Sequence, residues 1–432
     1  MWVLTLRKIK VASGELAEAH RAAAYPLSFA DSPAAFPTGS SDAEADGQDD
    51  PDGTSALWLG APRMLERLGV HRGAQVGVDQ LALALQGRNA MTGERVRREG
   101  WIQRDATDPH GRPLYDEQGR RVKVGVHGTK SVDLTFSAPK SVSVVWSQAG
   151  PELRARIEPA MLAAADAMLE CMTMTKPVVA HRRVLGPAHG FAAAAALHVT
   201  ARTAKLETVP SPQLHVHGVL VGVERADGFF ASPELSGMFR YGAPLEGGAV
   251  ARAKLAELLV EMGFEIDGQT GRAGRFFEIK GVPLGLLDRM SSRTRDVEAG
   301  IREREAAKGK RLTNGERAVV ALQTRAPKSR EPAPAQAVAA WRATAEDFDF
   351  VPATVAALRR GSGFAEGLDA RRESVRAAVL QRVCERGASA SIGELRAAVL
   401  ECAAGRLRLD EASTLLRDME NAGELPAVQR GG

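Results

Sequence analysis

The chain has 432 residues, 44% hydrophobic and 25% charged, which is typical of a soluble protein with room for two or three domains. Its net charge of +4 permits a polyanionic partner without requiring one. Three widely spaced cysteines argue against both a disulfide framework and a cysteine zinc site. No apolar run approaches the roughly 20 residues of a membrane span, so we expect a cytoplasmic protein with no membrane insertion.

The first three quarters of the sequence alternates strands with helices. A strand over 2–9 and a helix over 13–25 precede an acidic insert, residues 37–55, whose Gly, Ser and Asp content is typical of a disordered loop. The further predicted elements are helices over 61–69 and 78–87, a strand interrupted by a turn at 137–140 within 132–147, a helix over 151–174, strands over 177–184, 191–202, 213–224 and 228–232, a helix over 247–263 and a hairpin over 264–282. This order predicts an α+β domain covering residues 1–330.

A proline- and alanine-rich joint begins at Pro327, and nearly all of the remaining sequence has a helical pattern. We therefore predict a helical C-terminal module over residues 331–432. Two interpretations of this module stay open. It is either a winged-helix-like unit that binds DNA or partners, or a structured stub that precedes a lost motor domain.

Two histidines, His215 and His217, lie one residue apart in the apolar strand PQLHVHGVLVGV. Side chains at i and i+2 share one face of a strand, with Cβ atoms about 6–7 Å apart, so the two imidazoles can bind one divalent cation. His198, on the preceding strand, would complete the site if the two strands pair. The alternative, on spacing alone, is a hydrogen-bonded histidine pair without a metal.

The segment PQLHVHGVLV resembles the central motif of the TrwC-type (MobF class) conjugative relaxases, a group of nucleases with a histidine–hydrophobe–histidine motif. VDLTFSAPKSVSVVWS is a second, independent match, and LWLGAPRMLERLGV, LHVTAR and VALQTRAPKS support it. The resemblance covers residues 1–345. It implies an antiparallel-sheet relaxase domain with flanking helices, which binds a hairpin and the adjacent single strand at an origin of transfer and nicks one strand there.

The resemblance also implies site residues and partners. His198, His215 and His217 would bind a divalent cation, Mg²⁺ or Mn²⁺, and Asp133 of the motif DLTFSAPK would orient a ligand histidine or assist the nucleophile. In this family a tyrosine hydroxyl attacks the phosphorus and keeps the DNA 5′ end as a phosphotyrosyl ester, and Tyr25 is the tyrosine in the corresponding region. Further implied partners are other relaxosome proteins and a type IV secretion coupling protein.

Basic side chains are candidate DNA contacts. Lys140, beside the turn, and Arg202 can bind phosphate, although solvated side chains would look the same in the sequence. Between Asp288 and Glu331 there are twelve Arg or Lys against seven Asp or Glu. Such a basic segment suits a phosphate backbone, and Arg289 and Arg293 are its first candidates.

The sequence departs from the family pattern in three places. Glu15, Ala19 and His20 stand where tyrosines are usual, so the alternative function is a catalytically weakened relaxase that binds DNA as an accessory protein. The interval between His198 and His215 is longer than usual, which a loop absorbs at little cost. The sequence lacks a helicase phosphate-loop motif, so we expect a stand-alone relaxase domain, a truncated one, or one with a separate helicase.

A third interpretation of the function, besides the relaxase and the accessory protein, is a metal hydrolase that uses the same histidines on a small substrate.

Overall fold

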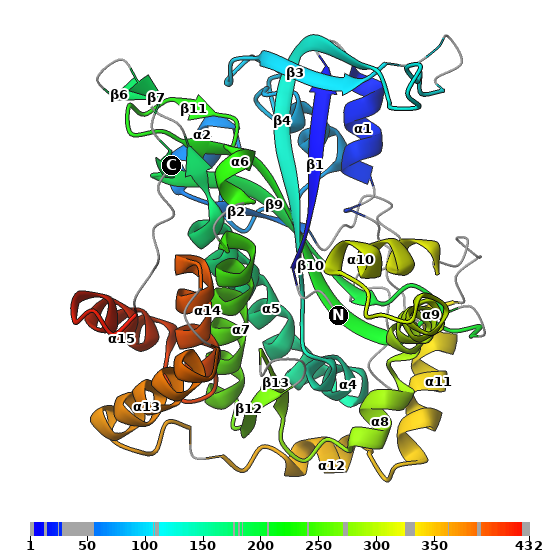
Figure 1. The fold of residues 1–432 in the computed structure, drawn as a ribbon, viewed down its shortest axis with the longest axis vertical. Coiled ribbons are helices and arrows are strands. Elements are labelled where there is room, and N and C mark those ends of the chain that lie inside the picture. Colours follow the sequence, from blue (N-terminus) through cyan, green and yellow to red (C-terminus); the bar gives the residue numbers. More distant parts are fainter. Residues whose placement is uncertain are drawn as a thin grey trace.

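The fold is that of a computed structural model of the 432-residue chain (Figure 1). Tyr25 and the acidic insert at 37–55 lie outside the residues that the structure describes. The described residues are 4–12, 15–24, 26–27, 56–106, 108, 112–175, 178–179, 182–183, 185–204, 207–239, 242–270, 275–324, 333–361, 363–386 and 390–425.

A seven-stranded antiparallel sheet forms the centre of the molecule (Figure 1). Its order is β1-β4-β10-β9-β2, with β3 paired to β4 and β11 paired to β10. The strands are β1 (Leu4–Ala12), β2 (Ala56–Gly60), β3 (Gly100–Asp105), β4 (Lys123–Ser137), β9 (Gly190–Thr200), β10 (Pro212–Glu224) and β11 (Phe230–Ala231). The predicted α+β class with an antiparallel sheet is therefore confirmed.

Helices cover both faces of this sheet (Figure 1). The first face carries α4 (Lys140–Gln148), α5 (Pro151–Met172) and α7 (Ala243–Glu261). The second face carries α1 (Leu16–Ala24), α2 (Pro62–Arg67) and α3 (Val78–Leu85). Apolar side chains on each face of the sheet thus have a helical layer to pack against, which is why the central strands are apolar on both sides.

The alternation of side chains along β10 decides which face carries the histidines. Leu214 and Val216 pack into the core under α5, and Val219 packs into the core under α1–α3. Because successive side chains in a strand point to opposite faces, His215 and His217 share the face of Val219. The glycine after the pair has a packing reason, since a Cβ on Gly218 would lie only 3.2 Å from Cδ1 of Leu169 on α5.

The segment after the turn at 137–140 is a helix, and the prediction of a strand on both sides of this turn was wrong. Helix α4 begins at Lys140, directly after the turn. Its last carbonyls are satisfied by the guanidinium of Arg154 on α5, which donates to Trp146 (3.1 Å) and Ser147 (3.2 Å). Residues 141–148 are all buried, so the valine-rich pattern reflects burial on every side rather than a β conformation.

The hairpin formed by β3 and the first half of β4 was not predicted. It extends beyond the helical layers at one end of the molecule (Figure 1). The signal for it is the valine alternation at Val122, Val124 and Val126. Several side chains of this ribbon are exposed, including Trp101, whose ring centroid lies 4.5 Å from that of His127.

Smaller elements complete the main body. The predicted hairpin over 264–282 is confirmed as β12 and β13. The other elements are β5 (Met174–Thr175), β6 (Val178–Val179), β7 (Arg182–Arg183), β8 (Gly186–Pro187), α6 (Leu235–Met238), β12 (Ile266–Thr270), β13 (Phe276–Ile279), α8 (Leu284–Arg289), α9 (Ser292–Lys308) and α10 (Asn314–Gln323). Among the described residues, no helix combines the length and apolar character needed to cross a membrane.

The C-terminal helices attach to the main body in two groups. The first group packs into the main core through Trp341, whose indole N–H donates to the carbonyl of Pro210 (2.8 Å). The second group packs on α7, where Arg252 and Arg382 both bind the buried carboxylate of Glu401. The helices are α11 (Pro334–Glu346) and α12 (Pro352–Ala357) in the first group, and α13 (Leu368–Arg386), α14 (Ile392–Ala403) and α15 (Leu409–Asn421) in the second.

The division of the chain at residue 330 stays a prediction. The packing places α11 and α12 with the main body, so a unit made of the second group alone would begin at α13. The described residues from 333 to 425 contain helices and no strand, and the strands of a winged helix are therefore not among them.

Candidate metal centre

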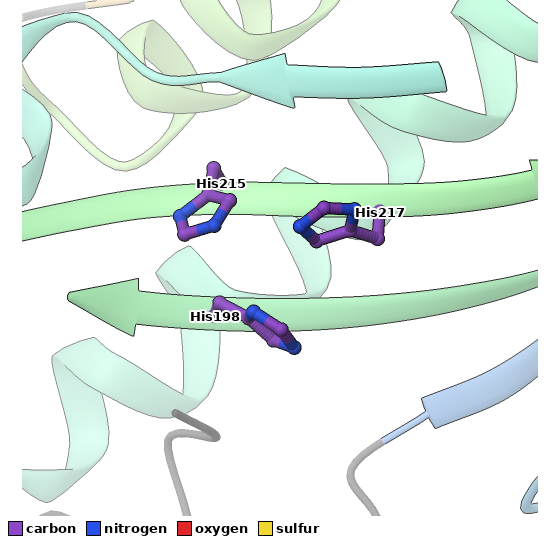
Figure 2. Close-up of side chains that lie close together, drawn as sticks. All are labelled: His198, His215 and His217. Atoms are coloured by element: carbon purple, nitrogen blue, oxygen red, sulfur yellow. The ribbon is translucent and has the colours of Figure 1, made fainter. Parts of the chain in front are cut away.

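Three histidine rings meet on the α1–α3 face of the sheet, at the pairing of β9 with β10. His215 lies directly opposite His198 in this ladder, and His217 follows two residues later on β10. The ring centroids are 4.9 Å apart for His198–His217, 5.2 Å for His198–His215 and 5.3 Å for His215–His217. Figure 2 shows the three rings turned toward one another. One ring nitrogen from each lies within 4.8 Å of the others, which is close enough for one cation to contact all three.

His217 is oriented by a buried carboxylate. Its Nδ1 lies 2.9 Å from Oδ2 and 3.0 Å from Oδ1 of Asp133, on the neighbouring strand β4. The hydroxyl of Thr135 lies 3.2 Å from the same nitrogen and donates toward Asp133 (3.4 Å). A carboxylate only accepts hydrogen bonds, so the proton of the neutral ring is on Nδ1 and the lone pair is on Nε2. This carboxylate–histidine pair is the arrangement that orients ligand histidines in metal sites.

The other two histidines are oriented by backbone carbonyls. His215 donates from Nδ1 to the carbonyl of Gln213 (3.0 Å), which leaves the lone pair on its Nε2. His198 donates from Nε2 to the carbonyl of Pro26 (2.9 Å), which leaves the lone pair on its Nδ1. All three rings therefore have a second partner that fixes the tautomer. The donor set fits one divalent cation held by three imidazole nitrogens.

His215 is held in its neutral form. Burial, with a smaller contribution from the adjacent rings of His198 and His217, lowers the pKa of His215 to about 3. Two protonated imidazoles this close together would repel each other, and the low pKa keeps His215 unprotonated at neutral pH. A neutral imidazole is the form that binds a metal.

This low pKa predicts acid instability of the metal-free protein. An unfolded histidine takes up a proton near pH 6.5, whereas folded His215 does so only near pH 3, so stability should fall as the pH drops through this window. We expect the urea midpoint of metal-free protein to decrease from pH 7 to pH 4.5. A His215→Gln variant should lose less stability over the same range, and an equal loss in both proteins would contradict the assignment.

The histidine cluster and its carboxylate partner lie within the part of the chain that a comparison with protein families matches. A sequence model of the TrwC relaxase family matches residues 39–348, which is well over half of the chain. The chain belongs to the TrwC relaxase family. A comparison with curated proteins found no match.

Solved structures of TrwC share the fold of this family member. One is the conjugative relaxase TrwC in complex with oriT DNA in a metal-bound form, with a TM-score of 0.54 and 22% identity over 80% of this chain and 99% of that chain. A copper-bound complex with oriT DNA has a TM-score of 0.53 and 23% identity, with the same coverage. A third is TrwC with a 27-mer DNA that comprises the recognition hairpin and the cleavage site, with a TM-score of 0.52, 22% identity and the same coverage. The predicted relaxase fold is thereby confirmed.

The basic residues predicted to contact DNA lie in different environments of the TrwC-family fold. Lys140 is half-buried and donates to the carbonyl of Pro212 (2.8 Å). Burial lowers its pKa to about 7, and the nearby carboxylate of Glu278 partly offsets this effect. Arg202 is exposed just beyond the end of β9. The contact of each with DNA stays a prediction.

The two arginines of the basic segment that were predicted to contact DNA already have partners within the protein. Arg289 lies 3.0 Å from the carboxylate of Glu207, in the loop between β9 and β10. Arg293 donates to the carbonyls of Ala321 (2.6 Å) and Thr324 (2.9 Å), and this joins α9 to the end of α10. DNA binding by either one stays a prediction, and Arg293 has a structural role besides.

Three members of this site were not predicted from the sequence. They are the hydroxyl of Thr135 and the two carbonyls that receive the histidine protons, those of Pro26 and Gln213. Thr135 has a sequence signal, because it stands two residues after Asp133 and so shares its face of the strand. The two carbonyls have no sequence signal, because every residue carries a backbone carbonyl.

Proposed function

We propose that this TrwC-family protein nicks one DNA strand at an origin of transfer by metal-assisted transesterification, with Tyr25 as the nucleophile. The observation that carries the proposal is the hydrogen bond between His198 and the carbonyl of Pro26. Tyr25 lies outside the described residues, but it is bonded directly to Pro26. Pro26 is thus part of the surroundings of the cluster, and Tyr25 is proposed as the nucleophile because it precedes Pro26 in the sequence.

The residues around the cluster suit attack on a phosphodiester. Each imidazole would bind a cation in its neutral form, and the Asp133 carboxylate, buried against His217, supplies one negative charge. A divalent cation bound here would leave the centre with one net positive charge, which complements one phosphodiester and stabilises charge on its non-bridging oxygens. The tyrosyl ester formed on Tyr25 conserves the energy of the phosphodiester, so religation needs no nucleotide cofactor.

The donor set bears on which cation binds. Magnesium prefers oxygen ligands and keeps much of its water, whereas imidazole nitrogen is a ligand of transition metals. We therefore propose Mn²⁺ or another transition metal rather than Mg²⁺ for the three-histidine site. The ring nitrogens that carry the lone pairs are Nδ1 of His198 and Nε2 of both His215 and His217, and these would be the ligand atoms.

The substrate proposed is a single strand beside a DNA hairpin. The solved TrwC complexes contain oriT DNA, one of them with a recognition hairpin and cleavage site, and this chain shares their family and fold. Other relaxosome proteins and a type IV secretion coupling protein are proposed as partners on the family membership alone. The exposed ribbon of β3 and β4 and the side chains of Lys140 and Arg202 are the proposed DNA contacts.

A labelled-oligonucleotide assay tests the proposed function. Single-stranded DNA from the region around the gene, chosen for an inverted repeat, is incubated with the protein and Mn²⁺ and run on a denaturing gel. We expect a 3′ label to migrate with the protein, because the 5′ end of that fragment is esterified to it, and a 5′ label to appear on a shorter strand. EDTA should prevent both. DNA binding without either product would favour the accessory-protein alternative, and no binding at low salt would contradict both functions.

A further inference from the structure

The segment of β10 that leads into His215 leaves the regular ladder. Pro212 pairs with Thr200 and His215 pairs with His198, so two residues of β10 stand opposite one residue of β9. This is the geometry of a β-bulge, in which the ladder no longer supplies every hydrogen-bond partner. The backbone groups of Gln213 and Leu214 must then be satisfied from elsewhere, because both residues are buried.

The turn after β4 and helix α4 supply partners for the backbone of Leu214 and for its neighbours on β10. The amide N–H of Leu214 donates to the hydroxyl of Ser143 (2.9 Å), and its carbonyl accepts from the N–H of Ala138 (2.9 Å). The side chain of Gln213 donates to the carbonyl of Ala138 (2.9 Å). The ammonium of Lys140 donates to the carbonyl of Pro212 (2.8 Å). We call Ala138, Lys140 and Ser143 the α4 clamp.

The clamp acts at the carbonyl that orients a metal ligand. Gln213 receives the Nδ1 proton of His215, so the position of this carbonyl decides where the Nε2 lone pair points. A bulge held only by solvent would leave the carbonyl with several orientations. The clamp binds the residues on both sides of it, Pro212 and Leu214, as well as the Gln213 side chain.

We infer that Ser143 and Lys140 are positioning residues for the metal ligand His215, acting through the bulge at 213–214. The inference rests on the proposed function in one respect, namely that the three histidines bind a cation. On this inference the motif SAPKSVS does more than form the turn, because its hydroxyl and its ammonium group form hydrogen bonds with the strand that carries the ligand. It also gives Lys140 a role at the metal site that does not depend on contact with DNA.

Helix α4 offers a matched control for Ser143. Ser147 is equally buried on the same helix, but its hydroxyl donates to the carbonyl of Val144 within the helix (2.7 Å). Ser143→Ala and Ser147→Ala therefore remove the same group from the same helix, and only the first touches β10. A role in packing alone predicts equal effects of the two changes on metal affinity.

The test is calorimetric titration of the full chain with Mn²⁺, alongside thermal unfolding of the metal-free proteins. We expect Ser143→Ala to bind Mn²⁺ about 10-fold more weakly, in the range found for residues that orient metal ligands, and Ser147→Ala to bind as the wild type does. Equal affinity in all three proteins, or equal weakening in both variants, would overturn the inference and leave the proposed function intact. Failure of the wild type to bind Mn²⁺ would overturn both.

Lys140→Met provides a second measurement in case Ser143→Ala does not fold. Its side chain is half-buried, so the loss of one hydrogen bond to Pro212 should be tolerated by the fold. We expect weaker Mn²⁺ binding in the absence of DNA, by several-fold. Unchanged Mn²⁺ affinity combined with weaker DNA binding would assign Lys140 to DNA contact and remove it from the inference.

Discussion

Tyr25→Phe is expected to abolish the covalent protein–DNA adduct completely while leaving DNA affinity and Mn²⁺ affinity unchanged. The change removes one oxygen atom, the proposed nucleophile, and keeps the aromatic ring. The carbonyl of Pro26 remains available to His198, so the metal centre should be undisturbed. A denaturing gel with 3′-labelled DNA measures the adduct, and calorimetry measures the metal.

Tyr115→Phe is the control for this experiment. Tyr115 is exposed in the segment that joins β3 to β4, outside the two strands of the ribbon, and the loss of its hydroxyl should leave adduct formation intact. Adduct formed at wild-type level by Tyr25→Phe would exclude Tyr25 as the nucleophile. The wild-type protein decides between the nicking relaxase and the accessory DNA-binding protein. A catalytically weakened relaxase would form no adduct even with Tyr25 present.

The histidine site was predictable because its spacing has a geometric meaning. An i, i+2 pair on an apolar strand shares one face, and the prediction that a neighbouring strand brings His198 to the same face is confirmed by the pairing of His198 with His215. Strand pairing itself is not written in local sequence. The motif resemblance supported the pairing of the two strands, and it also selected Asp133. The contact of Asp133 with His217 does not follow from any rule on sequence spacing.

The two elements that were not predicted from the sequence have different causes. The valines of α4 suggest a strand, but this helix is buried on all sides and its carbonyl end is satisfied by Arg154 of the next helix, a contact that the apolar pattern does not reveal. Tertiary contacts override local propensity in such a segment. The ribbon of β3 and β4 was missed for a different reason, since its valine alternation lies on a largely exposed hairpin and not in an apolar core strand.

His217→Ala is expected to weaken Mn²⁺ binding by at least about 100-fold and to remove most nicking at limiting metal, because ligand loss should exceed the effect of losing an orienting partner. It also leaves the buried Asp133 carboxylate without its imidazole partner, so a lower melting temperature is expected as well. His189→Ala is the control, since His189 is exposed and lies outside the cluster. Calorimetry and the labelled-DNA gel measure the two effects separately.

Asp133→Asn, combined with His217→Ala in a double-mutant cycle, separates the two roles predicted for Asp133. If the carboxylate only orients His217, then Asp133→Asn should weaken Mn²⁺ binding by about 10- to 100-fold alone and add nothing once His217 is gone. If it also assists the nucleophile, nicking at saturating Mn²⁺ should fall further in the double variant than in His217→Ala. Additive losses in metal affinity would contradict the orienting role, because two residues in one hydrogen bond cannot contribute independently to the same site.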